Sequence, residues 1–164
     1  MKATFFTILL LFMSLTVHAT SSVVGTIEEY GIYKSVGALD TFASSGTAAK
    51  HSTFGSYAFV KKTNKVQIAK GVSFGFVWSA SGFPDIDAIS ITHILEHPPI
   101  ITPNGETVRV SKETYYYKPV NGKITHTEGY SFFDDFELVE GQYKFTVLYK
   151  GNTIVTKTFI ATRK

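Results

Sequence analysis

A repeat of large apolar side chains at every second position is the feature that most restricts how this chain folds. Phe74, Phe76 and Trp78 form one such run, and Phe145 and Val147 belong to another near the C-terminus. Successive side chains of a β-strand point to opposite faces, so a period of two collects these residues on one face. The pattern predicts strands that bury one face in a core, with Trp78 as a structural residue of that core.

Turn residues separate the alternating runs at short intervals. Asn-Gly at residues 121–122 and Gly-Asn at 151–152 have the composition of two-residue hairpin loops, and Pro-Asn-Gly at 103–105 marks another turn. β-branched and aromatic residues fill the segments between turns. The 44% of hydrophobic residues suffice for the core of one domain. We therefore predict an all-β fold, a single immunoglobulin-like antiparallel β-sandwich with about seven to nine strands.

One strand entrance has a recognisable structural signature. Leu138 is followed by Gly141 and Tyr143, a Leu-x-x-Gly-x-Tyr spacing. It resembles the tyrosine corner of immunoglobulin-like sandwiches, in which the tyrosine hydroxyl bonds to backbone a few residues upstream. We expect Tyr143 and Gly141 to have this structural role, with an ordinary core tyrosine as the alternative.

Three segments are expected to be loops. Residues 34–56 are rich in Ser, Ala, Thr and Gly, with few large apolar side chains, and are predicted to form one long loop. Residues 100–106 and 129–135 are shorter candidates. Because recognition residues concentrate on loops, these three segments are the candidate binding surfaces.

The N-terminus has the three parts of a secretory signal peptide. Met1-Lys2 is a short positive region, residues 5–17 are mostly apolar, and residues 17–19 offer a cleavage site. The apolar run is shorter than the roughly 20 residues that span a bilayer. We predict a signal peptide at 1–19, a domain at 20–164, no stable membrane insertion, and export to the periplasm or the extracellular space. With no cysteine, the exported domain relies on packing for its stability.

The charge pattern argues against a nucleic-acid partner. The formal net charge is +3, and basic and acidic residues are interspersed along the chain. Nucleic-acid binding requires a clustered basic face. We expect no nucleic-acid partner and no cofactor.

Two motifs suggest enzymes, and neither has the local structure that its chemistry needs. Gly71 to Gly75 reads G-x-S-x-G, but Ser73 opens an alternating strand and not a strand-to-helix elbow. His93, Glu96 and His97 read H-x-x-E-H, which binds zinc when a helix stacks the two histidines. In a strand, residues four apart are separated by about 13 Å, too far for one zinc ion.

A zinc-dependent hydrolase using His93 and His97 therefore remains only an alternative. A metal site that recruits His51 or His126 from elsewhere stays open at this stage. The acidic pairs Asp85/Asp87 and Asp134/Asp135 lack the spacing of a calcium loop, and we expect them in solvated turns.

The aromatic run Tyr115, Tyr116 and Tyr117 is the candidate binding surface outside the loops. Alternation directs at least one of these rings outward, where it is able to stack on a sugar or contact a protein. Packing on an edge strand is the competing interpretation. A carbohydrate-binding module using these tyrosines is a second alternative function.

Several blocks together resemble a family of short exported bacterial proteins that is known only as a domain of unknown function. The blocks are residues 25–33, 66–76, 97–99 with 103–105, and 136–145. Their motifs are structural: glycine turns, His-Pro, and the Gly-x-aromatic strand entrance. The resemblance implies a bacterial exported domain and supplies no activity and no catalytic residues.

These observations favour a non-enzymatic binding or accessory module of the bacterial envelope. Its partner is expected to be an envelope protein or a glycan. No catalytic residue is predicted.

Overall fold

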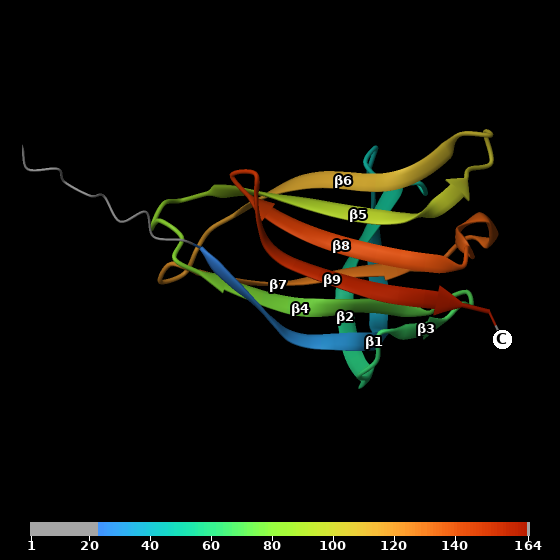
Figure 1. Cartoon of the computed structure of the whole chain (residues 1–164), viewed down its shortest axis with the longest axis horizontal. Coiled ribbons are helices and arrows are strands. Elements are labelled where there is room, and N and C mark those ends of the chain that lie inside the picture. The colour runs from blue at the N-terminus through green and yellow to red at the C-terminus, as the bar shows by residue number, and fades with distance from the viewer. Residues whose placement is uncertain (1–22, 164) are drawn as a thin grey trace, which may run out of the picture.

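The computed structural model describes residues 23–163, so the signal peptide predicted at 1–19 lies outside the described residues. The described chain forms nine strands in two sheets, and one short 3-10 helix, η1 (Asp135–Glu137) (Figure 1). The first sheet has the order β2 (His51–Lys61), β1 (Val24–Ala43), β4 (Ser73–Ser81), β7 (Lys123–Ser131). The second has the order β3 (Lys65–Gln67), β9 (Asn152–Thr162), β8 (Gly141–Tyr149), β5 (Ile89–Ile101), β6 (Thr107–Tyr117).

All strand pairs are antiparallel except β3 with β9. The predicted all-β sandwich is confirmed, and its nine strands fall within the expected number. Residues 23–163 contain no helix that is long and apolar enough to cross a membrane.

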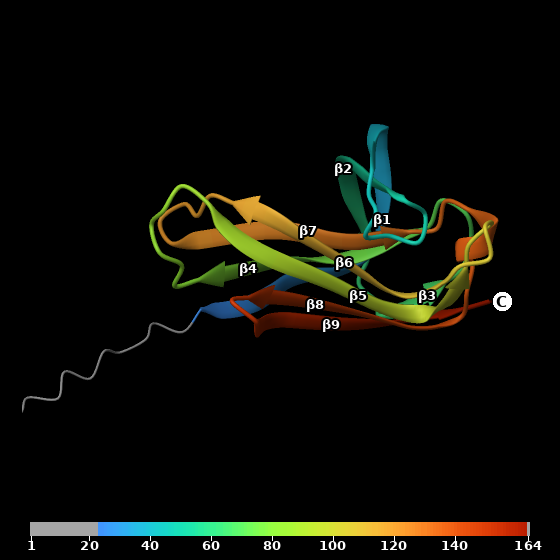
Figure 2. The same ribbon diagram turned by 90° about the horizontal axis from the view of Figure 1, so that it is seen from above.

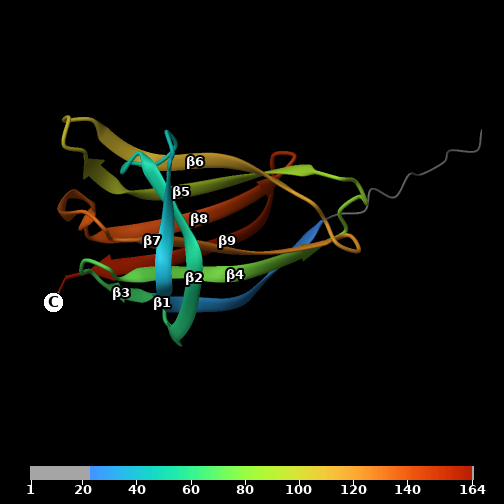
Figure 3. The ribbon, with the colours of Figure 1, turned by 180° about the vertical axis from the view of Figure 1, so that it is seen from behind.

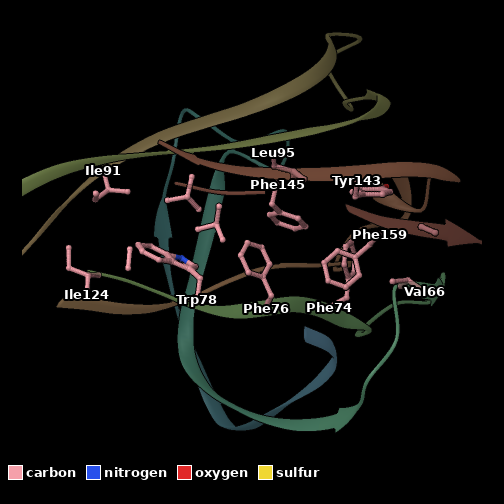
Figure 4. Close-up of a cluster of buried hydrophobic side chains, with 14 of the residues drawn as sticks. Val66, Phe74, Phe76, Trp78, Ile91, Leu95, Ile124, Tyr143, Phe145 and Phe159 are labelled. Carbon is pink, nitrogen blue, oxygen red and sulfur yellow. The ribbon is translucent and has the colours of Figure 1, made fainter. Parts of the chain in front are cut away.

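The alternating residues of β4 form the centre of the core. Phe74, Phe76 and Trp78 are essentially inaccessible to solvent and point at the opposite sheet (Figure 4). Phe76 packs edge-on against Phe145 of β8 with 5.6 Å between ring centroids, and Phe74 packs against Phe159 of β9 at 5.2 Å. Edge-to-face pairs of this kind add stabilisation to the burial of the rings. The packing explains how the described domain holds together without a disulfide.

The tyrosine corner is present as predicted. Tyr143 is fully buried, and its hydroxyl donates a 2.9 Å hydrogen bond to the carbonyl oxygen of Val139. Gly141 has φ +136°, and a Cβ there would lie 2.7 Å from Cγ of Pro98. A side chain at position 141 would therefore collide with β5 as well as strain the backbone.

The predicted long loop at 34–56 is wrong, because these residues form most of a β-hairpin. Residues 24–33 of β1 pair with β4, after which β1 leaves that strand and continues to Ala43 paired only with β2. Figure 2 shows this hairpin standing out from the sandwich, and Figure 3, the view from behind, shows it crossing in front of β7. We call residues 34–58 the arm. Its small Ser, Ala, Thr and Gly side chains show no apolar alternation in the sequence. Backbone hydrogen bonding forms the two strands without that alternation.

Candidate functional site

The arm covers a cleft of about 690 Å³ at the seam between the two sheets. One wall is β7, the outer strand of the first sheet, and the facing wall is β6, the outer strand of the second. The arm lies over the gap and contributes His51, Thr53, Gly55 and Tyr57 from β2. We call this space the arm cleft. The other two predicted loops are partly wrong, because residues 100–101 belong to β5 and residues 129–131 belong to β7. Residues 129–131 and Phe133 line the cleft, and residues 100–106 do not.

The tip of the arm is fastened to β6. The backbone N–H of Lys112 donates a 3.2 Å hydrogen bond to the carbonyl oxygen of Gly46, and the Ser44 hydroxyl donates to the Glu113 carboxylate. A Cβ on Gly46 would lie 2.5 Å from the Lys112 carbonyl oxygen. Glycine thus permits the close approach, and Ser44 and Ala48 become buried although they lie in a hairpin turn. The contact closes one side of the arm cleft.

The tyrosine run divides between the two faces of β6. Tyr115 and Tyr117 are partly buried in the cleft wall, whereas the side chain of Tyr116 is 77% exposed. The Tyr115 hydroxyl donates to Glu113. Burial raises the pKa of both Tyr115 and Tyr117 above the usual tyrosine range, and the nearby carboxylates raise it further. Both hydroxyls therefore stay protonated at neutral pH. A single exposed patch of three tyrosines is not formed.

A chain of polar contacts joins the two walls of the cleft. His93 of β5 is 6% exposed, and its Nε2 lies 3.0 Å from the Tyr117 hydroxyl. Its Nδ1 lies against Oε1 of Glu128 on β7, which is also 3.7 Å from Nε2 of His126. Burial lowers the pKa of His126, and the charge of Glu128 opposes this shift without cancelling it. His126 is accordingly neutral at neutral pH.

A fully buried carboxylate, that of Glu137, also belongs to the cleft wall. Glu137 is 2% exposed and accepts hydrogen bonds from the Tyr130 hydroxyl at 2.8 Å and from the backbone N–H groups of Phe133 and Asp134 at 3.0 and 2.9 Å. These bonds satisfy the charge and shape the turn that ends β7. Sequence reasoning had considered Asp134 and Asp135 in this segment and missed Glu137.

The histidine motif does not form a zinc site. β5 is extended, so His93 and His97 share one face but are about 13 Å apart along the strand. His97 Nδ1 lies 2.8 Å from the carbonyl oxygen of Pro98, and Glu96 is exposed and bonded to Lys144 at 2.7 Å. Within residues 23–163, no three His, Cys, Asp or Glu side chains are grouped so that they can hold a metal ion. The helix that the zinc interpretation required is absent from this segment.

His51 and His126, the other candidate ligands, have separate surroundings. Nδ1 of His51 lies 3.0 Å from the carbonyl oxygen of Ala49, and its ring packs against Phe133 with 6.3 Å between centroids. His126 packs against Tyr117 at 5.0 Å. Both histidines line the cleft, His51 from the arm and His126 from β7.

The remaining sequence motifs lie where ordinary strand and turn residues lie. Ser73 is a buried residue of β4 whose hydroxyl is 2.7 Å from that of Ser131. Asp87 and Asp135 are exposed and pair with Lys118 and Lys70 at 3.0 and 2.9 Å. Such exposed ion pairs contribute little stability.

Comparison with known proteins agrees with this architecture. The family model described as Domain of unknown function (DUF3859) matches residues 21–160. The chain belongs to this family. The DUF3859 domain is also similar to a crystal structure of an immunoglobulin-like protein from Pseudomonas aeruginosa, with a TM-score of 0.58 and 22% identity over 88% of this chain and 100% of that one. The predicted immunoglobulin-like fold is thereby confirmed.

Two weaker structural similarities are to parts of larger proteins. One is the alkylpurine DNA glycosylase AlkC of Pseudomonas fluorescens bound to DNA containing an abasic site analog, with a TM-score of 0.41 and 9% identity over 60% of this domain and 27% of that chain. The other is a β-glucosidase from Listeria innocua in complex with glucose, with a TM-score of 0.39 and 16% identity over 60% and 14%. No curated protein matches the DUF3859 domain by sequence.

Proposed function

We propose that this DUF3859 domain is an exported, non-enzymatic binding module of the bacterial envelope whose ligand occupies the arm cleft. The observation that carries the proposal is the arm, which is anchored at its tip and covers a cavity of about 690 Å³. Small-molecule sites have volumes of about 300 to 1,000 Å³ and combine apolar walls with a few convergent polar groups. The cleft has both properties. Export rests on the N-terminal sequence pattern.

A binding role fits the way the polar groups of the wall are used. Tyr117 contacts His93, and both Ser44 and Tyr115 donate to Glu113. Tyr117 is held by β5 and Glu113 by the arm, and Tyr115 is held by its neighbour on β6. A wall fixed in this way loses little conformational entropy when a ligand arrives, which favours affinity.

The carbohydrate alternative rests on Tyr115 and Tyr117, whose rings line the cleft. A sugar would stack on these rings, as in other aromatic-lined sites. A glycan array separates this alternative from other ligand classes. Binding to a defined glycan that Tyr115→Ala abolishes would support it, and an array without signal would remove it.

The arm offers a direct test of the proposal. Ser35 and Tyr57 are paired across the hairpin, so an Asn-Gly turn between them can replace residues 36–56. The central hydrophobic cluster includes no residue from 36–56, so we expect this truncated variant to remain folded. A fragment library of amines, sugars and short peptides is then screened against both proteins by NMR.

The expected result is a bound fragment that shifts the backbone amide signals of β6, β7 and residues 51–57 in the full chain and does not bind the truncated variant. Fragments that shift signals elsewhere, or that bind equally well without the arm, would contradict the proposal. Failure of every fragment to bind the full chain would also count against it.

A further inference from the structure

The arm cleft carries charge of a single sign. Its lining includes the carboxylates of Glu113, Glu128 and Glu137 and no lysine or arginine of the described chain. The chain as a whole has 16 basic and 13 acidic side chains and a net charge of +3. An anionic cavity in a cationic protein is the reverse of what the average composition gives. The charge of the lining therefore excludes anionic ligands and favours cations.

The carboxylate of Glu128 is the best placed to meet a ligand. Its Oε1 contacts His93 and His126, whereas its Oε2 makes no hydrogen bond or ion pair with another residue in the range 23–163. Oε2 is also partly accessible to solvent. One oxygen of Glu128 thus holds the wall together and the other remains free to accept a hydrogen bond or face a positive charge.

Aromatic rings supply the second half of the recognition chemistry. Tyr57 from the arm, Tyr115 and Tyr117 from β6, and Phe133 next to η1 all line the cleft. The faces of such rings attract cations within about 6 Å of the ring centroid. This chain already uses the interaction elsewhere, since Nζ of Lys157 lies 3.2 Å from the centroid of the Tyr30 ring.

We propose that the arm cleft binds an organic ammonium ion, with the positive charge between the Glu128 carboxylate and the tyrosine rings. This inference rests on the proposed binding function and names its ligand class. Rings combined with carboxylates suit an alkylated or primary ammonium group better than a bare metal ion, because they contact carbon and charge together. The arm would keep water from the bound charge and so strengthen the attraction.

Isothermal titration calorimetry with a matched pair of ligands tests the proposal. Choline carries a quaternary ammonium group, and 3,3-dimethylbutan-1-ol is its neutral isostere with carbon in place of nitrogen. Putrescine provides a primary ammonium arm, and glucose provides a neutral sugar. We expect choline or putrescine to bind at least about tenfold more tightly than the neutral alcohol, and this preference to shrink as ionic strength rises.

Variants of the carboxylates locate the charge. Glu128→Gln and Glu113→Gln each remove one charge from the cleft, and Glu96→Gln removes an exposed charge outside it as a matched control. Ammonium binding should weaken about tenfold or more in Glu128→Gln, less in Glu113→Gln, and not in Glu96→Gln. Thermal melting shows whether each variant is folded, and the ligand pair gives its answer on the unaltered chain.

The outcomes separate the two proposals. If the neutral alcohol or glucose binds in the cleft as tightly as choline and putrescine, the binding function stands and the ammonium inference is overturned. If both ammonium ions fail while another fragment binds the cleft, the ammonium inference alone fails. If nothing binds the full chain, both are wrong.

Discussion

The anchoring of the arm gives a prediction whose size follows from two contacts. The amide of Lys112 points away from β5 and donates to Gly46 at the arm tip. When the tip opens, this amide is exposed on the outer edge of β6, so its hydrogen exchange reports the docked state. A neutral amide bond contributes about 1 kcal/mol and a bond to a carboxylate about 2 kcal/mol. The Gly46 and Ser44 bonds together then hold the tip with about 3 kcal/mol, a protection factor on the order of 100.

The substitution Gly46→Ala removes this docking without touching the core. Its Cβ would lie 2.5 Å from the Lys112 carbonyl oxygen and 2.8 Å from Cγ of Glu113, so the tip must move away from β6. We expect Lys112 exchange to accelerate at least about tenfold, and the loss of about 1.4 kcal/mol or more of docking energy to lower the melting temperature by roughly 3 °C or more while the domain stays folded. Ser45→Ala, an exposed neighbour in the same turn, is the control.

Hydrogen exchange followed by NMR measures this directly. An unprotected Lys112 amide in the unaltered chain would refute the docked arm. Equal exchange rates in Gly46→Ala and the unaltered chain would show that the close approach at Gly46 does not matter. Loss of protection throughout β6 and β5 together would mean that the substitution had unfolded the domain.

Three further predictions concern the core, the pH response and metal content. Tyr143→Phe should lower the free energy of unfolding by about 1–2 kcal/mol in urea titrations, because it leaves the Val139 carbonyl without its partner. The control is Tyr149→Phe, since the Tyr149 hydroxyl makes no hydrogen bond within the described chain. It should change the free energy of unfolding by less than about 0.5 kcal/mol. Burial lowers the pKa of His97 and of His126 in the folded state, so on acidification the unfolded chain binds protons at a higher pH than the folded chain does. The free energy of unfolding should therefore fall as pH drops below about 6.5, by at most about 1.4 kcal/mol per pH unit for each histidine. A melting temperature that rises between pH 7.5 and 5 would contradict this. Purified protein should contain well under one zinc per chain by elemental analysis, with no change in melting temperature on adding EDTA, and stoichiometric zinc that is lost in His93→Ala would overturn that expectation.

The central strands were predictable because their side chains carry a strong contrast. Phe74, Phe76 and Trp78 differ enough from their neighbours that the period of two is visible in one pass, and the structure buries them as expected. Tyr143 was predictable for a similar reason, since its partner Val139 is only four residues away and the spacing to Gly141 is local. Structural features that depend on residues close together in the chain can be predicted before the tertiary structure is known.

The arm cleft was not predictable in this way. Glu113, Glu128 and Glu137 come from three separate elements and have no motif in common. The spacing of His126 and Glu128 places both on one face of a strand, and this is the one local sequence signal of that wall. What faces them, Tyr115 and Tyr117, lies on the other sheet.

The sequence by itself determined the alternating central strands, the buried face of β4 and the tyrosine corner. Each depends on side-chain alternation or on spacing within a few residues. Only the tertiary structure decided that residues 34–58 form a paired arm, that its Gly46 meets β6, and that three carboxylates and several tyrosines surround one cavity. The physical reason is that backbone pairing needs no apolar pattern, and a cleft is defined by contacts between residues distant in the chain.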